Sequence, residues 1–146
     1  MSERKVALIT GISGQDGSYL SEHLIEQGYD VHGIIRRQST AENQESRLDH
    51  IESLVETYYG DLTDVPSLTR LITSIKPTHI FNLGAMSHVR ISFDIPSYTI
   101  QTNGLGVLNL LEVYREFVPE AKFYQASSSE MFGNSFDEDK FQRETT

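Results

Sequence analysis

The stretch LITGISGQDG, residues 8–17, decides the fold. It carries an apolar strand end into three glycines, Gly11, Gly14 and Gly17, spaced G-x-x-G-x-x-G. Glycine adopts the backbone angles of a tight strand-to-helix turn at low cost and lets phosphate groups approach the backbone amides. The helix that follows offers unpaired N–H groups and the positive end of its dipole to an anion. The pattern therefore predicts a phosphate-binding turn between a strand and a helix.

Beyond this turn, strand-like and helix-like segments alternate along the chain. The apolar runs predict strands over residues 5–10, 30–35, 79–83 and 122–127, and another strand that ends at residue 59. Helices are expected over about 15–27, from 63 or 64 to about 75, and from 96 to about 117, the last with Leu108 and Leu111 on its inner face. Such alternation favours an α/β fold, a Rossmann-type doubly wound parallel sheet with helices on both faces and the strand order reversing beside the first strand.

Composition narrows the class of protein. The 146 residues suit one domain, and a hydrophobic fraction of 38% is typical of a folded chain. A net charge of −9 disfavours nucleic acid or an anionic membrane as partner, and no stretch reaches the length of a membrane span. The absence of cysteine suits a reducing compartment such as the cytoplasm, and the five scattered histidines predict no metal site.

Five loops follow the predicted strands, and in a parallel sheet such loops share the carboxyl edge, where ligands bind. The second of them carries Arg36 and Arg37 where an NAD-binding chain would place an acidic residue, and Asp30 lies at the wrong end of its strand. Guanidinium groups match a 2′-phosphate with forked donors. The sequence therefore favours NADP over NAD. The five loops comprise residues 11–15, 36–37, 61–62, 83–87 and 127–130.

Over almost its full length the chain resembles the extended short-chain dehydrogenase/reductase family, and within it the GDP-mannose 4,6-dehydratases. The resemblance rests on five segments, TGISGQDGSYL (10–20), GYDVHGIIRR (28–37), YYGDLTD (58–64), NLGAMSHVRISF (82–93) and FYQASSSEMFG (123–133). It implies a redox-neutral reaction on GDP-mannose. The sugar C4 hydroxyl is oxidised by NADP⁺, the C5 proton and the C6 hydroxyl leave as water, and the hydride returns to C6.

The resemblance also assigns roles to residues. Ser128 takes the place of the hydroxyl that binds the C4 oxygen, and Glu130 takes the place of the base that removes the C5 proton. The implied cofactor contacts are Gly11, Ile12, Ser13, Gly14, Gln15 and Asp16 for the phosphates, Arg36, Arg37, Gln38 and Ser39 for the 2′-phosphate, Asp61 and Leu62 for the adenine, and Leu83, Gly84, Ala85, Met86, Ser87 and Tyr98 beyond these.

The chain departs from the family pattern at several positions. Ser128 replaces the usual threonine, and Asn103 stands where this branch more often has Asp. Ser129, by contrast, resembles the GDP-mannose branch, because the related dTDP-glucose dehydratases have an aspartate there, and it leaves the acid for water loss unassigned. No tyrosine is followed by lysine four positions later, whereas the family has a catalytic Tyr-x-x-x-Lys. We therefore expect residues 1–146 to be an NADP-binding domain, the N-terminal part of a longer, homo-oligomeric enzyme whose substrate-binding part lies beyond residue 146.

Two other interpretations of the sequence stay open. A non-catalytic NADP-binding module would explain the missing Tyr-x-x-x-Lys, although such a module has no need of Glu130. A 4-keto sugar-nucleotide reductase of the same superfamily would share the cofactor site but would need no carboxylate base.

Overall fold

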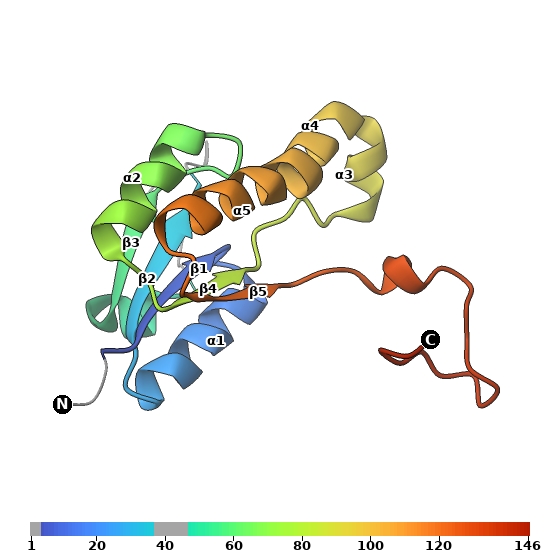
Figure 1. Cartoon of the computed structure of the whole chain (residues 1–146), viewed down its shortest axis with the longest axis horizontal. Coiled ribbons are helices and arrows are strands. Elements are labelled where there is room, and N and C mark those ends of the chain that lie inside the picture. The colour runs from blue at the N-terminus through green and yellow to red at the C-terminus, as the bar shows by residue number, and fades with distance from the viewer. Residues whose placement is uncertain (1–3, 37–46) are drawn as a thin grey trace.

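The computed structural model describes residues 4–36 and 47–146. In it, five parallel strands form one sheet in the order β3-β2-β1-β4-β5 (Figure 1). From β1 the chain adds β2 and β3 on one side and then β4 and β5 on the other, so the strand order reverses beside β1, as predicted. The strands are β1 (Val6–Thr10), β2 (Asp30–Ile35), β3 (Val55–Tyr59), β4 (His79–Asn82) and β5 (Lys122–Gln125).

Helices cover both faces of this sheet (Figure 1). One face carries α1, and the opposite face carries α2 and α5, which contact each other. Together with the parallel strands, this arrangement confirms the predicted Rossmann-type fold. The α-helices are α1 (Gln15–Glu26), α2 (Val65–Ile75), α3 (Val89–Asp94), α4 (Pro96–Ile100) and α5 (Gly106–Phe117), and shorter helical turns are η1 (Asp49–Leu54), η2 (Gln101–Leu105) and η3 (Ser129–Phe132).

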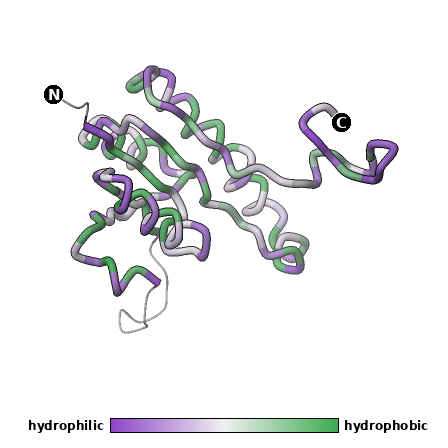
Figure 2. Tube along the Cα trace, turned by 90° about the horizontal axis from the view of Figure 1, so that it is seen from below, coloured by the Kyte–Doolittle hydropathy of each residue, from purple (hydrophilic) through white to green (hydrophobic). Residues whose placement is uncertain are grey.

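Two hydrophobic cores lie on the two sides of the sheet. Because side chains alternate along a strand, Ala7 and Ile9 of β1 pack toward α1, whereas Leu8 packs with α2 and α5. Figure 2 shows the corresponding hydrophobic stretches along the central strands. Burial on both faces explains the near-continuous apolar run of the central strand β1, whereas the edge strands β3 and β5 are more exposed and more polar.

The long helix expected over 96–117 differs from the prediction. The chain forms α4, then the π-helical turn η2, then α5, and a further helix, α3, precedes them. Leu108 and Leu111 were predicted to face the core, but they are 51% and 38% exposed. The inner face is instead formed by Gly106, Leu110 and Val113, and Gly106 is required there because a Cβ on it would lie 2.8 Å from the Cβ of Leu62.

Residues 126–146 extend away from the sheet in both views (Figures 1 and 2). The segment makes local bonds of its own, such as those from Arg143 to Asp137 and Asp139. The guanidinium of Arg143 lowers the pKa of Asp139 below its usual value. Within the described ranges, no helix is both long enough and apolar enough to cross a membrane.

Candidate functional site

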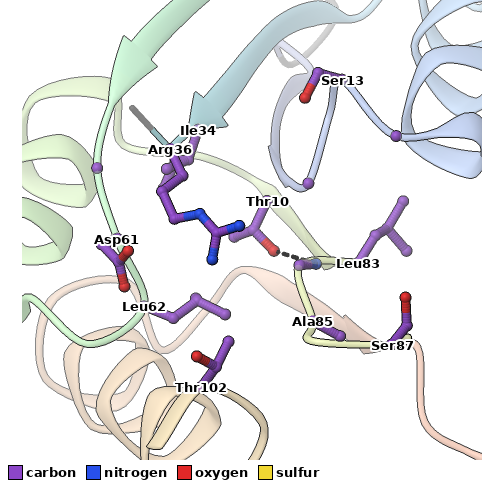
Figure 3. A pocket seen from close by; sticks show the side chains of 14 residues that line it. Thr10, Ser13, Ile34, Arg36, Asp61, Leu62, Leu83, Ala85, Ser87 and Thr102 are labelled. Carbon is purple, nitrogen blue, oxygen red and sulfur yellow. Dashed lines mark hydrogen bonds between the residues drawn. The ribbon is translucent and has the colours of Figure 1, made fainter. Parts of the chain in front are cut away.

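Four of the five predicted loops meet around a cavity of about 250 Å³ at the carboxyl ends of the strands (Figure 3). The glycine turn after β1, Arg36 after β2, Asp61 and Leu62 after β3, and the loop after β4 all line it. The opposite wall includes Thr102 from η2. The site therefore lies where β1 separates the two halves of the sheet, which is the position where ligands bind in such folds.

The glycine turn is shaped by close backbone contacts. Gly11 has a φ of +71°, and a Cβ placed on it would lie 2.9 Å from the amide nitrogen of Gly84. A Cβ on Gly17 would lie 2.4 Å from the carbonyl oxygen of Gly11, so glycine is required there for α1 to approach β1. Gly14 is the N-cap of α1, where no side chain bonds to the first amides. Those N–H groups are thus available to an anion.

Arg36 brings positive charge to the cavity. Figure 3 shows its guanidinium directed into the space between Asp61 and the loop after β4. It donates to the hydroxyl of Tyr98 and lies 5.7 Å from the centroid of that ring, so α4 orients it. The carboxylate of Asp61 accepts from the amide and hydroxyl of Thr63, at 2.8 and 2.7 Å. Asp30 lies at the other end of β2 and pairs with Arg4.

A buried chain of hydrogen bonds fixes the start of the loop after β4. The amide of Gly84 donates to Thr10 Oγ1 at 2.9 Å (dashed in Figure 3), and that hydroxyl donates to Asn82 Oδ1 at 2.5 Å. Asn82 Nδ2 then donates to Gln125 Oε1 at 2.8 Å. Thr10, Asn82 and Gln125 were not predicted as site residues. Their sequence signal is weak: each is the polar last residue of a strand.

Asn103 holds the same loop from the helix side. Its Oδ1 accepts from the amide of Met86 at 2.7 Å, and its Nδ2 donates to the carbonyl of Met86 at 2.9 Å. An aspartate at this position would keep the first bond and lose the second, because a carboxylate has no donor. This departure from the family pattern therefore has a clear structural consequence.

The remaining predicted cofactor contacts lie in different places. Ile12 is fully buried in the core and fills the space that a side chain on Gly33 would need. Gln15 and Asp16 are exposed at the start of α1, and neither they nor Met86 line the cavity. Arg37, Gln38 and Ser39 lie outside the described residues. Among residues 4–36 and 47–146, no three potential metal ligands of the His, Asp or Glu type are grouped to hold an ion.

The fifth predicted loop does not reach the cavity. Ser128 and Glu130 are exposed on the segment that follows β5, and Ser128 Oγ accepts from the amide of Glu130 at 3.2 Å. Because β5 is an edge strand and the chain leaves the sheet directly after it, the structure separates these two residues from the other four loops (Figure 1).

Comparisons with known proteins agree with the fold. The GDP-mannose 4,6-dehydratases of Cricetulus griseus and Vibrio cholerae are 51% and 49% identical over 140 and 139 residues, each match covering 89% of this chain. The chain spans 37% of the length of these relatives. The Thermus thermophilus UDP-glucose 4-epimerase, solved as a complex with NAD, superposes with a TM-score of 0.66 at 28% identity, covering 77% of this chain and 34% of that one. A family model described as GDP-mannose 4,6 dehydratase matches residues 8–146, so the chain belongs to the GDP-mannose 4,6-dehydratase family.

Proposed function

We propose that residues 1–146 form the NADP-binding part of a nucleotide-sugar 4,6-dehydratase that converts GDP-mannose to GDP-4-keto-6-deoxymannose. The observation that carries this proposal is the family match over residues 8–146, with relatives named for that activity. Because the chain spans 37% of their length, we assign cofactor binding to this chain and the dehydratase reaction to a protein of the relatives' length. The resemblance also supports a homo-oligomer in the cytoplasm.

Arg36 supports NADP rather than NAD as the cofactor. A guanidinium at the end of the second strand offers forked donors to a 2′-phosphate, whereas the ribose hydroxyl of NAD is usually bound there by a carboxylate. Asp30 is at the opposite end of β2, so it does not offer that carboxylate. Tyr98, which accepts a hydrogen bond from Arg36, would keep the guanidinium over the cavity.

The residues that line the cavity support a dinucleotide as its ligand. Gly11, Ser13 and Gly14 would hold the pyrophosphate against the uncapped start of α1. Asp61 and Leu62 would face the adenine, and the loop after β4 would line the path toward the nicotinamide. Thr102 lines the cavity, and its buried hydroxyl has no partner among the residues that the structure describes. Bound NADP would supply the hydride acceptor and donor for the reaction.

Ser128 and Glu130 are proposed to act on the sugar. The Ser128 hydroxyl would hydrogen-bond the C4 oxygen where charge develops, and the Glu130 carboxylate would remove the C5 proton, whose acidity rises once C4 is a ketone. Both residues are exposed and stand outside the cavity. These roles therefore require the segment after Gln125 to lie against the cavity in the complete enzyme.

The cofactor proposal is tested with Arg36→Ala. We expect NADP affinity to fall on the order of 10- to 100-fold, the effect of losing a charge-assisted bond, while NAD affinity changes little. Calorimetric titration of the 146-residue chain with both dinucleotides measures this. Arg70→Ala is the matched control, because it removes an exposed arginine on α2 that does not line the cavity. Equal losses for NADP and NAD would refute the proposed 2′-phosphate contact.

The dehydratase proposal is tested with Glu130→Gln in a protein of the relatives' length. Proton exchange at C5 in deuterated water and product formation should both fall about 10²- to 10⁴-fold, while GDP-mannose still binds. Glu138→Gln, an exposed glutamate on the same segment, is the control. Wild-type exchange in Glu130→Gln would show that another group is the base.

A further inference from the structure

Thr102 carries an unusual hydroxyl. Among the described residues, its Oγ1 is the one buried side-chain nitrogen or oxygen without a hydrogen-bond partner, and the residue is only 6% exposed. Buried polar groups are nearly always paired, and leaving one unpaired costs free energy. The described part of the free protein therefore contains a buried hydroxyl that a bound ligand would be able to pair.

The π-helical turn explains why the helix itself does not satisfy this hydroxyl. Threonines in helices commonly bond back to a carbonyl one turn earlier, as Thr73 does to Thr69 at 2.7 Å and Thr99 does to Ile95 at 3.1 Å. Thr102 lies in η2, where the hydrogen bonds span five residues and the turn is wider. The carbonyl of the preceding turn is therefore displaced from its usual place, and Oγ1 makes no such bond.

The surroundings of Thr102 form a firm wall of the cavity. Figure 3 shows the side chain projecting from its helix toward Leu62. The carbonyl of Leu62 accepts a hydrogen bond from Asn109 at 3.0 Å. One turn from Thr102, a Cβ on Gly106 would lie 2.8 Å from the Cβ of Leu62, so the loop after β3 packs directly on the helix. A ligand beside Leu62 would consequently also be beside Thr102.

We propose that the hydroxyl of Thr102 hydrogen-bonds the base edge of the adenine of bound NADP, an inference that rests on the proposed cofactor. If Arg36 binds the 2′-phosphate, the attached adenosine lies on the same side of the cavity, next to Leu62. An adenine edge presents both donors and acceptors, and a hydroxyl can both donate and accept. Because the hydroxyl is buried in the free protein, the proposed bond involves a rotation of about 120° around χ1 of Thr102, which exchanges the hydroxyl and the methyl group. Helical threonines populate two of these rotamers.

Thr102→Val tests this directly, because valine keeps the shape and removes only the hydroxyl. We expect the affinity for NADP and for 2′,5′-ADP, which retains the adenosine end alone, to fall by the same factor of about 2- to 10-fold. In the absence of ligand, the melting temperature of Thr102→Val should equal or exceed that of wild type, because an unpaired buried hydroxyl has been removed. A purely structural role would instead lower the melting temperature.

A pair of further variants tests the same hydrogen bond even if Thr102→Val does not fold. Thr102→Ser and Thr102→Ala differ by one oxygen atom, so the serine variant should bind 2′,5′-ADP more tightly than the alanine variant by about the same factor. Equal affinities in that pair, or unchanged affinity in Thr102→Val, would overturn the role of Thr102 while leaving the proposed cofactor intact. Failure of the wild-type chain to bind either ligand would overturn the proposed cofactor, and the inference with it.

Discussion

Thr10→Val probes the hydrogen-bond chain that connects the ends of β1, β4 and β5. Valine has nearly the shape of threonine, so the substitution removes the hydroxyl that accepts from Gly84 and donates to Asn82. Asn82 is fully buried, and its unpaired Oδ1 would cost about 1–3 kcal/mol. Loss of the bond from the Gly84 amide adds about 0.5–1.5 kcal/mol. We therefore expect the free energy of unfolding to fall by about 1.5–4.5 kcal/mol.

Urea unfolding followed by circular dichroism measures this change, provided that the slope with denaturant stays constant. Thr73→Val is the control, because its hydroxyl bonds to a helix carbonyl and should cost less than about 0.5 kcal/mol. Since Gly84 lines the cavity, Thr10→Val should also weaken NADP binding at temperatures where the chain is folded. A shift in unfolding midpoint no larger than that of Thr73→Val would refute the importance of the chain of hydrogen bonds.

Two further predictions concern the glycine turn and the dependence of stability on pH. Gly17→Ala should lower the free energy of chemical unfolding by about 2–5 kcal/mol, because the new Cβ would lie 2.4 Å from the Gly11 carbonyl oxygen. Gly28 has a φ of +77° but open space around it, so Gly28→Ala should cost only about 1–2 kcal/mol. Similar costs for the two variants would contradict the steric argument. Burial, together with Lys122 and Lys5, lowers the pKa of His79 below 6.5, so the unfolded state binds that proton more readily and stability should decline as pH falls below 6.5. His79→Phe should flatten this decline in melting temperature, and an unchanged slope would assign it to other groups.

The sheet and the position of the cavity could be predicted from the sequence because their signals are local. The central strand β1 is a buried apolar run, and the turn after it is marked by glycines that the backbone requires. The topology then follows from the alternation with helices, which places Arg36 at the edge where the glycine turn lies. The position of Ser128 away from the cavity could not be predicted in this way. Ser128 follows the edge strand β5, which has a neighbouring strand on one side only, so strand order alone does not fix where the chain runs after it.

The hydrogen bonds that shape the site depend on contacts between distant segments. Thr10 and Asn82 are 72 positions apart, and their bond exists only because β4 is the neighbour of β1. A polar residue at a strand end is common in loops of every kind, so Thr10, Asn82 and Gln125 could be recognised as a connected set only after the strand order was known. The pairing of Asn103 with Met86 is of the same type.

The helical segment from η2 through α5 connects the packing of the core to the chemistry of the cavity. Leucines occur on several sides of α5, so spacing alone allows an inner face of Leu108 and Leu111 or one of Gly106, Leu110 and Val113. The second is selected because Gly106 lets Leu62 approach the helix. With that register, Thr102 lies on the inner face, one turn before Gly106, and there the wider turn leaves its hydroxyl unpaired. The helix face that packs against Leu62 therefore also carries a buried, unpaired hydroxyl, on a residue that lines the cavity.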